Sequence, residues 1–164
     1  MNMDLALHSM HITTVSWLIA DWAHAIDDDR VERIAELMRE DGRYTVRSRF
    51  NADRGLPLAI IDTHSAAQLR DRIRSMRVAN IYQPQHYRHV VSAIQVTGQT
   101  QTRLLQVRSA FAVFRTLVTA GDTIFFAGGR SDDLIDVSGP EPRFAHRLMT
   151  FDSRAVETLM IIPI

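Results

Sequence analysis

Residues 103–118, RLLQVRSAFAVFRTLV, decide the fold class, because they alternate as one long β-strand with apolar side chains on both faces. One face carries Leu105, Val107, Phe111, Val113 and Leu117. The other face carries Leu104, Ala110, Ala112, Phe114 and Val118. An antiparallel sheet of a monomer usually leaves one face polar. The pattern therefore predicts that the second face is covered by a partner or by closure of the sheet.

Further strand-like segments lie on both sides of this strand. In the second half of the chain, strand-like segments span residues 89–96, 124–137, 143–152 and 159–164, and turn residues separate these segments. The first half adds residues 43–48 and 56–61, which lie on either side of a loop with Asn51, Asp53 and Gly55. The last segment, LMIIPI, is apolar, whereas free ends are usually polar. We therefore expect this tail to be docked in the protein.

Helical patterns fill the rest of the first half. Apolar residues from Ile12 to Ile26 recur with the spacing of one helix face, which predicts a long helix. Asp29 and Glu32 resemble a capping box for a short second helix that Asp41-Gly42 would end. A second capping box at residues 65–68 opens a helix that runs to about residue 79. Helices followed by hairpins indicate one α+β domain, residues 1–164, with an antiparallel sheet folded over a helical layer.

The composition excludes several classes of function. All nineteen basic residues are Arg and they balance nineteen acidic ones, so the basic excess typical of nucleic-acid binding is missing. The sequence has no Cys, which rules out an iron–sulfur cluster, a zinc–thiolate site and a cysteine nucleophile in this chain. No apolar run approaches 18 residues and no secretory leader is recognisable. We expect a cytoplasmic protein that spans no membrane.

Three histidines are candidates for chemistry. His24 lies near Asp21 and Asp28 at helical spacing, which suits a general base but is more often a surface histidine. His86 and His89 resemble metal ligands, with His64 or Asp62 as a third ligand. However, Pro84 keeps this segment out of a helix, so the two imidazoles should point to opposite faces of a strand. We favour a buried, hydrogen-bonded His89 whose carboxylate partner comes from the Asp53 loop.

Two arginine-rich segments allow a second kind of site. Asp53-Arg54-Gly55 lies in a loop, and Arg70, Arg72, Arg74 and Arg77 follow one another on the helix over residues 66–79. Phosphate binding is one interpretation. The zero net charge favours the other, in which Arg–Asp pairs connect loop, helix and a partner surface.

An ordered set of short segments resembles a known family across almost the whole chain. These segments are residues 23–29 (AHAIDDD), 40–44 (EDGRY), 51–58 (NADRGLPL), 71–73 (DRI), 79–82 (ANIY), 87–89 (YRH) and 158–164 (TLMIIPI). Together they resemble the small (beta) subunit of Rieske-type aromatic-ring-hydroxylating dioxygenases. The similarity is greatest to the branch that serves aromatic carboxylates, such as the terephthalate, salicylate and anthranilate types.

The resemblance implies a fold, a role and a set of partners. The implied fold is the cystatin-like, nuclear-transport-factor-2-like α+β cone, and the implied role is structural and not catalytic. The large (alpha) subunit would carry the Rieske 2Fe-2S cluster and the mononuclear Fe(II), and this subunit no cofactor. Three small subunits, as a homotrimer, would join three large ones in a hexamer. The positions carried over as fold and interface residues are Asp53, Arg54, Arg72, Tyr82, Arg88 and His89.

Two alternatives stay open. The same cone houses cavity enzymes that resemble ketosteroid isomerases, scytalone dehydratase and polyketide cyclases, and Tyr44, His24 and His89 would serve their acid–base chemistry. A stand-alone module that binds a small aromatic acid needs the same cavity but no base. Both alternatives require a roomy pocket with convergent polar groups. The structural role instead expects a cone filled by Trp17, Trp22, Phe111 and Phe126.

Overall fold

The computed structural model describes residues 2–79, 82–154 and 160–164, with side chains from Met10 onward. Its elements are α1 (Asn2–Asp27), α2 (Arg33–Glu36), β1 (Met38–Ser48), α3 (Arg49–Asp53), β2 (Ile61–Thr63), α4 (Ala66–Ala79), β3 (Gln85–Gln99), β4 (Leu105–Leu117), β5 (Thr123–Asp136) and β6 (Arg143–Phe151). No helix among these residues is long and apolar enough to cross a membrane.

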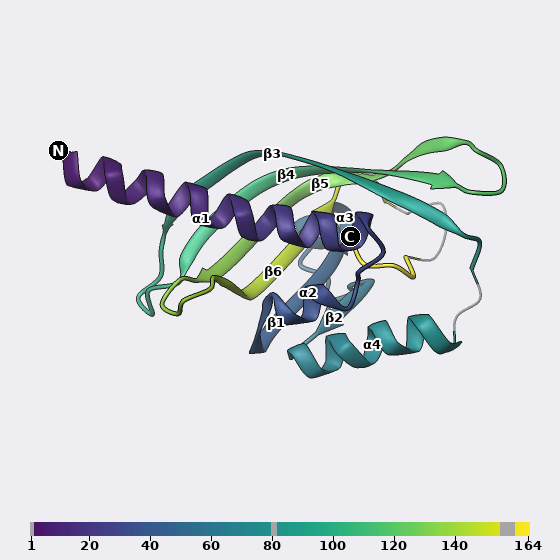
Figure 1. Ribbon diagram of the computed structural model, residues 1–164, viewed down its shortest axis with the longest axis horizontal. Helices are drawn as coiled ribbons and strands as arrows, with labels where there is room; N and C mark the ends of the chain where they lie inside the picture. The colour runs from purple at the N-terminus through teal and green to yellow at the C-terminus, as the bar shows by residue number, and fades with distance from the viewer. Residues whose placement is uncertain (1, 80–81, 155–159) are drawn as a thin grey trace.

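One curved sheet and a layer of helices make up the fold (Figure 1). The six strands follow the order β2-β1-β6-β5-β4-β3. β1 and β6 are parallel, and every other neighbouring pair is antiparallel. The strands arch over α1, which packs on β3, while α4 packs on β1. The predicted α+β class is confirmed, and we call the space between the inner face of the sheet and the helices the cone.

The region after α1 differs from the prediction. The capping box is not formed, because Asp29 has a φ of 58° and no side chain caps α2, which has only four residues. β1 starts at Met38 and continues through Asp41-Gly42, which therefore does not end a helix. A Cβ built on Gly42 would lie 2.9 Å from the Phe144 oxygen. Glycine is needed here for a close approach at a bulge between β1 and β6.

The predicted strand over residues 56–61 is also wrong. Ser48 accepts a hydrogen bond from the Asn51 N–H and so caps α3, where we expected a loop. The chain then runs as an exposed loop with Leu58 at 71% exposure, and β2 begins only at Ile61. The predicted helix over residues 66–79 is confirmed as α4, whose Leu69 faces the core.

The core lies between α1, α4 and the inner face of the sheet. From α1 it receives Val15, Ile19 and Trp22, whereas Trp17 is 71% exposed and does not fill the cone, as we had expected it to. Residues 160–164 pair with none of the described strands, so the predicted strand there is wrong. They are nevertheless docked, because Ile164 is fully buried. Leu159 lies outside the described residues.

Candidate functional site

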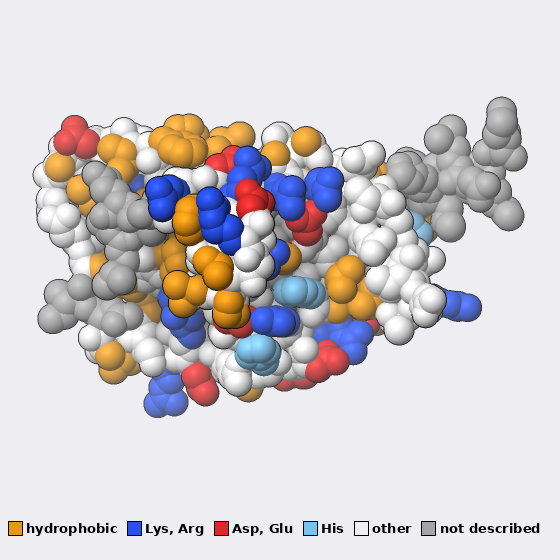
Figure 2. All heavy atoms as spheres, turned by 180° about the vertical axis from the view of Figure 1, so that it is seen from behind, with side chains coloured by type: hydrophobic (Ala, Val, Ile, Leu, Met, Phe, Trp, Pro, Cys, Tyr) orange, Lys and Arg blue, Asp and Glu red, His pale blue; other side chains and the backbone are white. Residues whose placement is uncertain are grey.

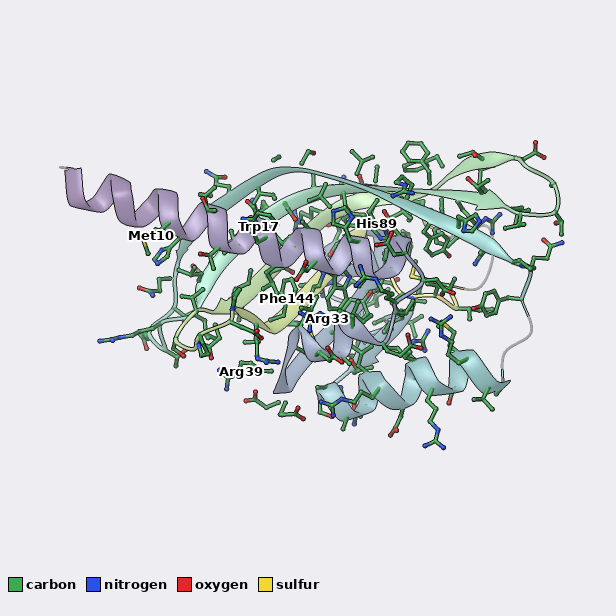
Figure 3. All side chains as sticks on the ribbon, in the orientation of Figure 1. Met10, Trp17, Arg33, Arg39, His89 and Phe144 are labelled. Carbon is green, nitrogen blue, oxygen red and sulfur yellow. The ribbon has the colours of Figure 1, made fainter. Side chains whose placement is uncertain are left out.

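The last residue of α1 and the first half of β3 meet in a buried carboxylate–imidazole pair. His89 Nδ1 lies 2.6 Å from a carboxylate oxygen of Asp27. The two side chains are only 2% and 3% exposed. The same carboxylate accepts the His89 main-chain N–H at 3.0 Å. Figure 3 places His89 beside the C-terminal half of α1, so this pair fastens the end of the helix to the sheet.

The pair has the arrangement of a general base that is oriented by a carboxylate. In the neutral tautomer whose Nδ1–H donates to Asp27, Nε2 is the nitrogen that could accept a proton. Nε2 is buried and has no hydrogen-bond partner among the described residues. The imidazole lies edge-on to Tyr87, which stacks on Phe126 with ring centres 5.1 Å apart. Because Nε2 has almost no accessible surface, there is no water-sized space beside it for a substrate.

The partner of His89 differs from the prediction. We expected a carboxylate from the Asp53 loop, but Asp53 is exposed at the end of α3. Asp27 takes that place from a position 62 residues away in the chain. No local spacing connects the two residues, so only the packing of α1 on β3 brings them together.

A second polar cluster lies in the middle of the core. The Tyr44 hydroxyl donates to the main-chain oxygen of Ile164 at 2.7 Å and accepts from its N–H at 3.2 Å. Trp22 Nε1 donates to the same oxygen at 3.2 Å. Burial raises the pKa of Tyr44, and the charge of Arg147 opposes only part of this rise. Tyr44 therefore stays protonated as a hydrogen-bond donor. All three bonded residues are fully buried, whereas the walls of a water-sized cavity would keep accessible surface.

A buried ion pair completes this interior. Arg147 on β6 donates to Asp133 on β5 at 2.9 Å, and the side chains are 3% and 0% exposed. Ser131 donates to the same carboxylate at 2.6 Å. Burial raises the pKa of Asp133, whereas Arg147 and Ser131 oppose this rise. The guanidinium also lies over the rings of Trp22 and Phe144, at 4.8 and 4.7 Å from their centres. Nothing in the sequence points to this pair, because no motif joins residues on two strands.

The structure does not gather the six carried-over positions into one site. Arg72 and His89 face the interior, where each makes a hydrogen bond. Tyr82 is half-buried and lines a surface pocket of about 350 Å³ together with Pro84 and Val118. The remaining three, which are all exposed, are Asp53, Arg54 and Arg88.

The other candidate histidines, His24 and His86, form no catalytic or metal site with the described residues around them. His24 is exposed on α1, as the surface interpretation expects. His86 is exposed whereas His89 is buried, so the two point to opposite faces as predicted. Asp62 binds Arg43 through two hydrogen bonds of 2.9 and 2.8 Å. Within the described part of the chain, no three His, Cys, Asp or Glu side chains are placed to hold a metal ion.

Among the described residues, apolar side chains face solvent on the sheet and on α1, in addition to the loop around Leu58. On the outer face of the sheet, Phe114 and Phe125 pack edge-to-face with ring centres 6.1 Å apart, and Phe125 is 60% exposed. Figure 2 shows the side of the molecule opposite to that of Figure 1, and apolar and Arg side chains lie next to one another on this surface. On α1, Met10 and Trp17 lie seven residues apart and thus on one side of the helix, and both are exposed. The second apolar face of β4 is therefore partly uncovered in the isolated chain.

Comparison with known proteins agrees with this picture. A family model described as "Ring hydroxylating beta subunit" matches residues 22–158. The chain is 32% identical over 140 residues to the anthranilate 1,2-dioxygenase small subunit of Burkholderia cepacia, covering 85% of each chain. It is also 32% identical over 145 residues to the beta 2 subunit of the terminal oxygenase component of terephthalate 1,2-dioxygenase from a Comamonas species, covering 88% of this chain and 93% of that one.

A solved structure extends the similarity to three dimensions. The beta subunit attributed to an aromatic-ring-hydroxylating dioxygenase of Novosphingobium aromaticivorans superposes with a TM-score of 0.85 at 26% identity. The superposition covers 94% of this chain and 97% of that one. The filled cone, the sequence matches and the superposition lead to one conclusion: this chain belongs to the family of ring-hydroxylating dioxygenase beta subunits.

Proposed function

We propose that this chain is the structural small subunit of a multicomponent terminal oxygenase and has no active site of its own. The observation that carries the proposal is the filled interior of the cone. Trp22, Tyr44 and Ile164 bury one another completely, at the position where a cavity enzyme would need room for a substrate. The protein atoms in the cone therefore support a role in assembly and not in turnover.

The redox chemistry of the proposed enzyme belongs to a partner. The sequence has no Cys, so this chain cannot supply the thiolates of a Rieske 2Fe-2S cluster. We assign the cluster and the mononuclear Fe(II) to a large (alpha) subunit. The named relatives are small or beta subunits of dioxygenases that act on anthranilate and terephthalate. Both compounds are aromatic carboxylates, which supports dihydroxylation of an aromatic carboxylic acid as the reaction of the assembled enzyme.

The proposed assembly is a homotrimer of this subunit within a three-plus-three hexamer in the cytoplasm, with residues 1–164 as one domain. Its support is the pair of exposed apolar surfaces, around Phe114 and Phe125 on the sheet and around Trp17 on α1. Exposed arginines such as Arg54 and Arg88 suit the rim of such contacts, because a guanidinium pairs well with a partner's carboxylate.

Co-expression with a large subunit tests this proposal. The partner is chosen as a neighbouring gene that encodes a Cys–His Rieske pattern. We expect the two chains to co-purify at the mass of a hexamer, and iron and turnover of an aromatic acid to be found only in that complex. An isolated chain that stays monomeric and ignores the large subunit, or that converts the acid alone, would contradict the proposal.

The Asp27–His89 pair is the one observation that favours a second function, that of a cavity enzyme with His89 as its base. This alternative requires that the cone open around Nε2. It predicts that His89→Gln and Asp27→Asn remove an isomerase or dehydratase activity of the isolated chain without lowering its melting temperature. If both variants lose stability and the isolated wild-type chain has no such activity, only the structural role of the pair remains.

A further inference from the structure

An ordered loop presents apolar side chains to solvent. Residues 54–60 (RGLPLAI), here called the Leu58 loop, connect α3 to β2. The side chains of Leu56, Leu58 and Ile60 are exposed, and so is Pro57. Apolar groups stabilise a protein when they leave water, by roughly 25 cal/mol for each Å² that is buried. Within this chain, the apolar side chains of the loop contribute little of that stabilisation.

Hydrogen bonds nevertheless fix the course of the Leu58 loop. The Leu56 N–H donates to the main-chain oxygen of Asn51 at 2.9 Å, and the Asn51 side chain donates to the Leu58 oxygen at 3.0 Å. At the far end, the Ile60 N–H donates to the Val46 oxygen at 2.8 Å. The apolar side chains are therefore held in place before a partner binds, which lowers the entropy cost of binding.

Two arginines lie beside the loop, on one aromatic ring. The guanidinium carbons of Arg54 and Arg154 are 3.8 and 4.4 Å from the ring centre of Phe50 on α3. Such stacking holds a guanidinium in place and leaves its N–H groups able to bind a carboxylate. Among the described residues, neither arginine has a carboxylate within ion-pair distance. Figure 2 shows apolar side chains directly beside Arg side chains near the centre of the face that it displays.

The charges around the loop leave an excess of positive charge. Residues 49–60 and 152–154 contain three Arg and two Asp, whereas the whole chain has a net charge of zero. Arg49 and Asp152 neutralise one another in an ion pair of 2.9 Å. Two guanidinium groups then remain with one exposed carboxylate, that of Asp53. We call the Leu58 loop together with Arg154 the Leu58 surface. It fits a partner that combines an apolar hollow with carboxylates.

Charge also separates the candidate partners of the Leu58 surface. If two copies of this chain met through it, Arg54 and Arg154 of one copy would face those of the other, and like charges oppose association. The apolar patch around Phe114 and Phe125 suits it no better, because the exposed Arg88 lies next to Phe114 in the sheet. A second copy is therefore disfavoured. The proposed function has one further component, the large subunit.

We propose that the Leu58 surface is the docking site for the large subunit. Leu56 and Leu58 enter an apolar hollow of that subunit, and Arg54 and Arg154 pair with carboxylates at the edge of the hollow. This inference rests on the proposed function, to which it adds the contact surface. It leaves the Phe114–Phe125 patch and the exposed side of α1 for contacts between small subunits.

Competition for one large subunit tests this assignment. The wild-type chain and a variant are co-expressed with an affinity-tagged large subunit, and mass spectrometry measures their ratio in the purified complex. We expect Leu58→Asp to be depleted about thirtyfold or more, the loss typical of a central contact residue. Val78→Asp, at a similarly exposed apolar residue of α4, is the matched control and should be incorporated like the wild type.

Charge variants test the role of the two stacked arginines. Arg54→Gln combined with Arg154→Gln should lower incorporation about three- to tenfold at low salt. The difference should shrink at about 0.5 M salt, which screens exposed charges. Arg74→Gln combined with Arg103→Gln, at two exposed arginines outside the Leu58 surface, is the matched control and should have no effect.

Hydrogen exchange provides a measurement on the wild-type protein. The main-chain N–H groups of Leu58 and Ala59 have no acceptor within the described part of the chain, so we expect them to exchange quickly in the isolated chain. In the complex with the large subunit, their exchange should slow by about tenfold or more. The N–H of Thr102, in an exposed turn between β3 and β4, is the control and should exchange equally in both samples.

The outcomes separate this inference from the proposed function. Equal incorporation of Leu58→Asp and wild type, or unchanged exchange at Leu58 in the complex, would overturn the inference alone. A wild-type chain that enters no complex with the large subunit would overturn the proposed function and the inference with it. Two results would assign the surface to another occupant and so overturn the inference: loss of small-subunit self-association in Leu58→Asp, which indicates a second copy, and Leu58-dependent binding of the isolated chain to anionic phospholipid vesicles, which indicates a membrane.

Discussion

Asp132 and Asp133 are neighbours on β5 but lie on opposite faces of the sheet. On the outer face, Asp132 accepts hydrogen bonds from Arg108 and Arg130, both at 2.9 Å, and these arginines are 57% and 49% exposed. On the inner face, Asp133 pairs with Arg147 at the same 2.9 Å, with almost no exposure. Distance alone therefore says little about the importance of an ion pair. Water screens the outer pairs, whereas only protein groups compensate the inner charges, and among the described residues the partner is the one group of opposite charge in contact with each.

Phe125 and Phe126, two neighbours on the same strand, also differ in burial between the two faces of the sheet. Phe126 is buried in the stack with Tyr87, whereas Phe125 points outward and is 60% exposed. The inner face thus stabilises this chain, whereas the outer face leaves apolar surface exposed, which we propose to be a contact surface. Substitutions at matched inner and outer positions test this division of roles.

The largest expected effect is at the inner aspartate. Asp133→Ala leaves the Arg147 charge buried without its partner and should lower the free energy of unfolding by about 3–5 kcal/mol. Asp132→Ala removes exposed pairs and should cost no more than about 1 kcal/mol. Urea denaturation at pH 7 measures both.

A double variant checks the cause of this effect. Replacing both inner partners, Asp133→Leu with Arg147→Met, should recover much of the stability that Asp133→Ala loses, because no uncompensated charge remains. Equal losses for Asp132→Ala and Asp133→Ala would remove the distinction between the two faces.

The next effect concerns two histidines on β3. His89→Ala leaves the buried Asp27 carboxylate without its ring partner and should cost about 1–3 kcal/mol of stability or reduce the yield of assembly. His86→Ala on the exposed side of the same strand should change the stability by less than about 0.5 kcal/mol. Thermal unfolding compares them. If the His89 variant melted like the wild type but its complex lost turnover, a catalytic role would be indicated.

The sequence predicts elements well where one periodic pattern dominates. α1 and α4 follow from the spacing of residues such as Ile19 and Leu69, and β4 to β6 follow from alternation between turn residues. The prediction fails at Asp41-Gly42. A pair of this kind usually ends a helix, but here it lies within β1, at a bulge in the pairing with β6. The expectation that Trp17 fills the cone fails for another reason: the residue is apolar but lies outside the periodic face of α1, and its apolar character alone does not place it in the core.

The interior site is less predictable for a different reason. His89 and Tyr44 were recognised as candidates, but their partners Asp27 and Ile164 are 62 and 120 residues away. Arg147 and Asp133 face each other only because β5 and β6 pair in one register. Contacts between elements of this kind depend on packing and leave no local spacing to read. The tail was predicted to be docked from its apolar character, but its irregular course was not.

A substitution in the Phe114–Phe125 patch on the outer face of the sheet should change stability less but should weaken assembly. Phe125→Asp should alter the free energy of unfolding by less than about 0.5 kcal/mol, because the ring is largely in solvent. It should nevertheless weaken self-association or co-purification with a large subunit. Val78→Asp, at an even more exposed residue of α4, is the control and should leave assembly intact. Light scattering at micromolar concentration separates the two outcomes, and identical behaviour would mean that the Phe114–Phe125 patch is not a contact surface.

The smallest expected effect is that of an outer ion pair, which sharpens the contrast with Asp133. The double hydrogen bond from Arg43 lowers the pKa of Asp62 below its ordinary 3.8, with help from Thr45. A carboxyl group with a depressed pKa stabilises the folded state above its unfolded pKa, and this contribution disappears as the pH falls through the folded value. Asp62→Asn should therefore cost a few tenths of a kcal/mol at pH 7. The stability curves of wild type and variant should converge as the pH falls below the depressed pKa of Asp62, or in about 1 M salt, which screens exposed charges. If the difference persisted under both conditions, Asp62 would act through packing, and the outer face would resemble the inner one more closely than its exposure indicates.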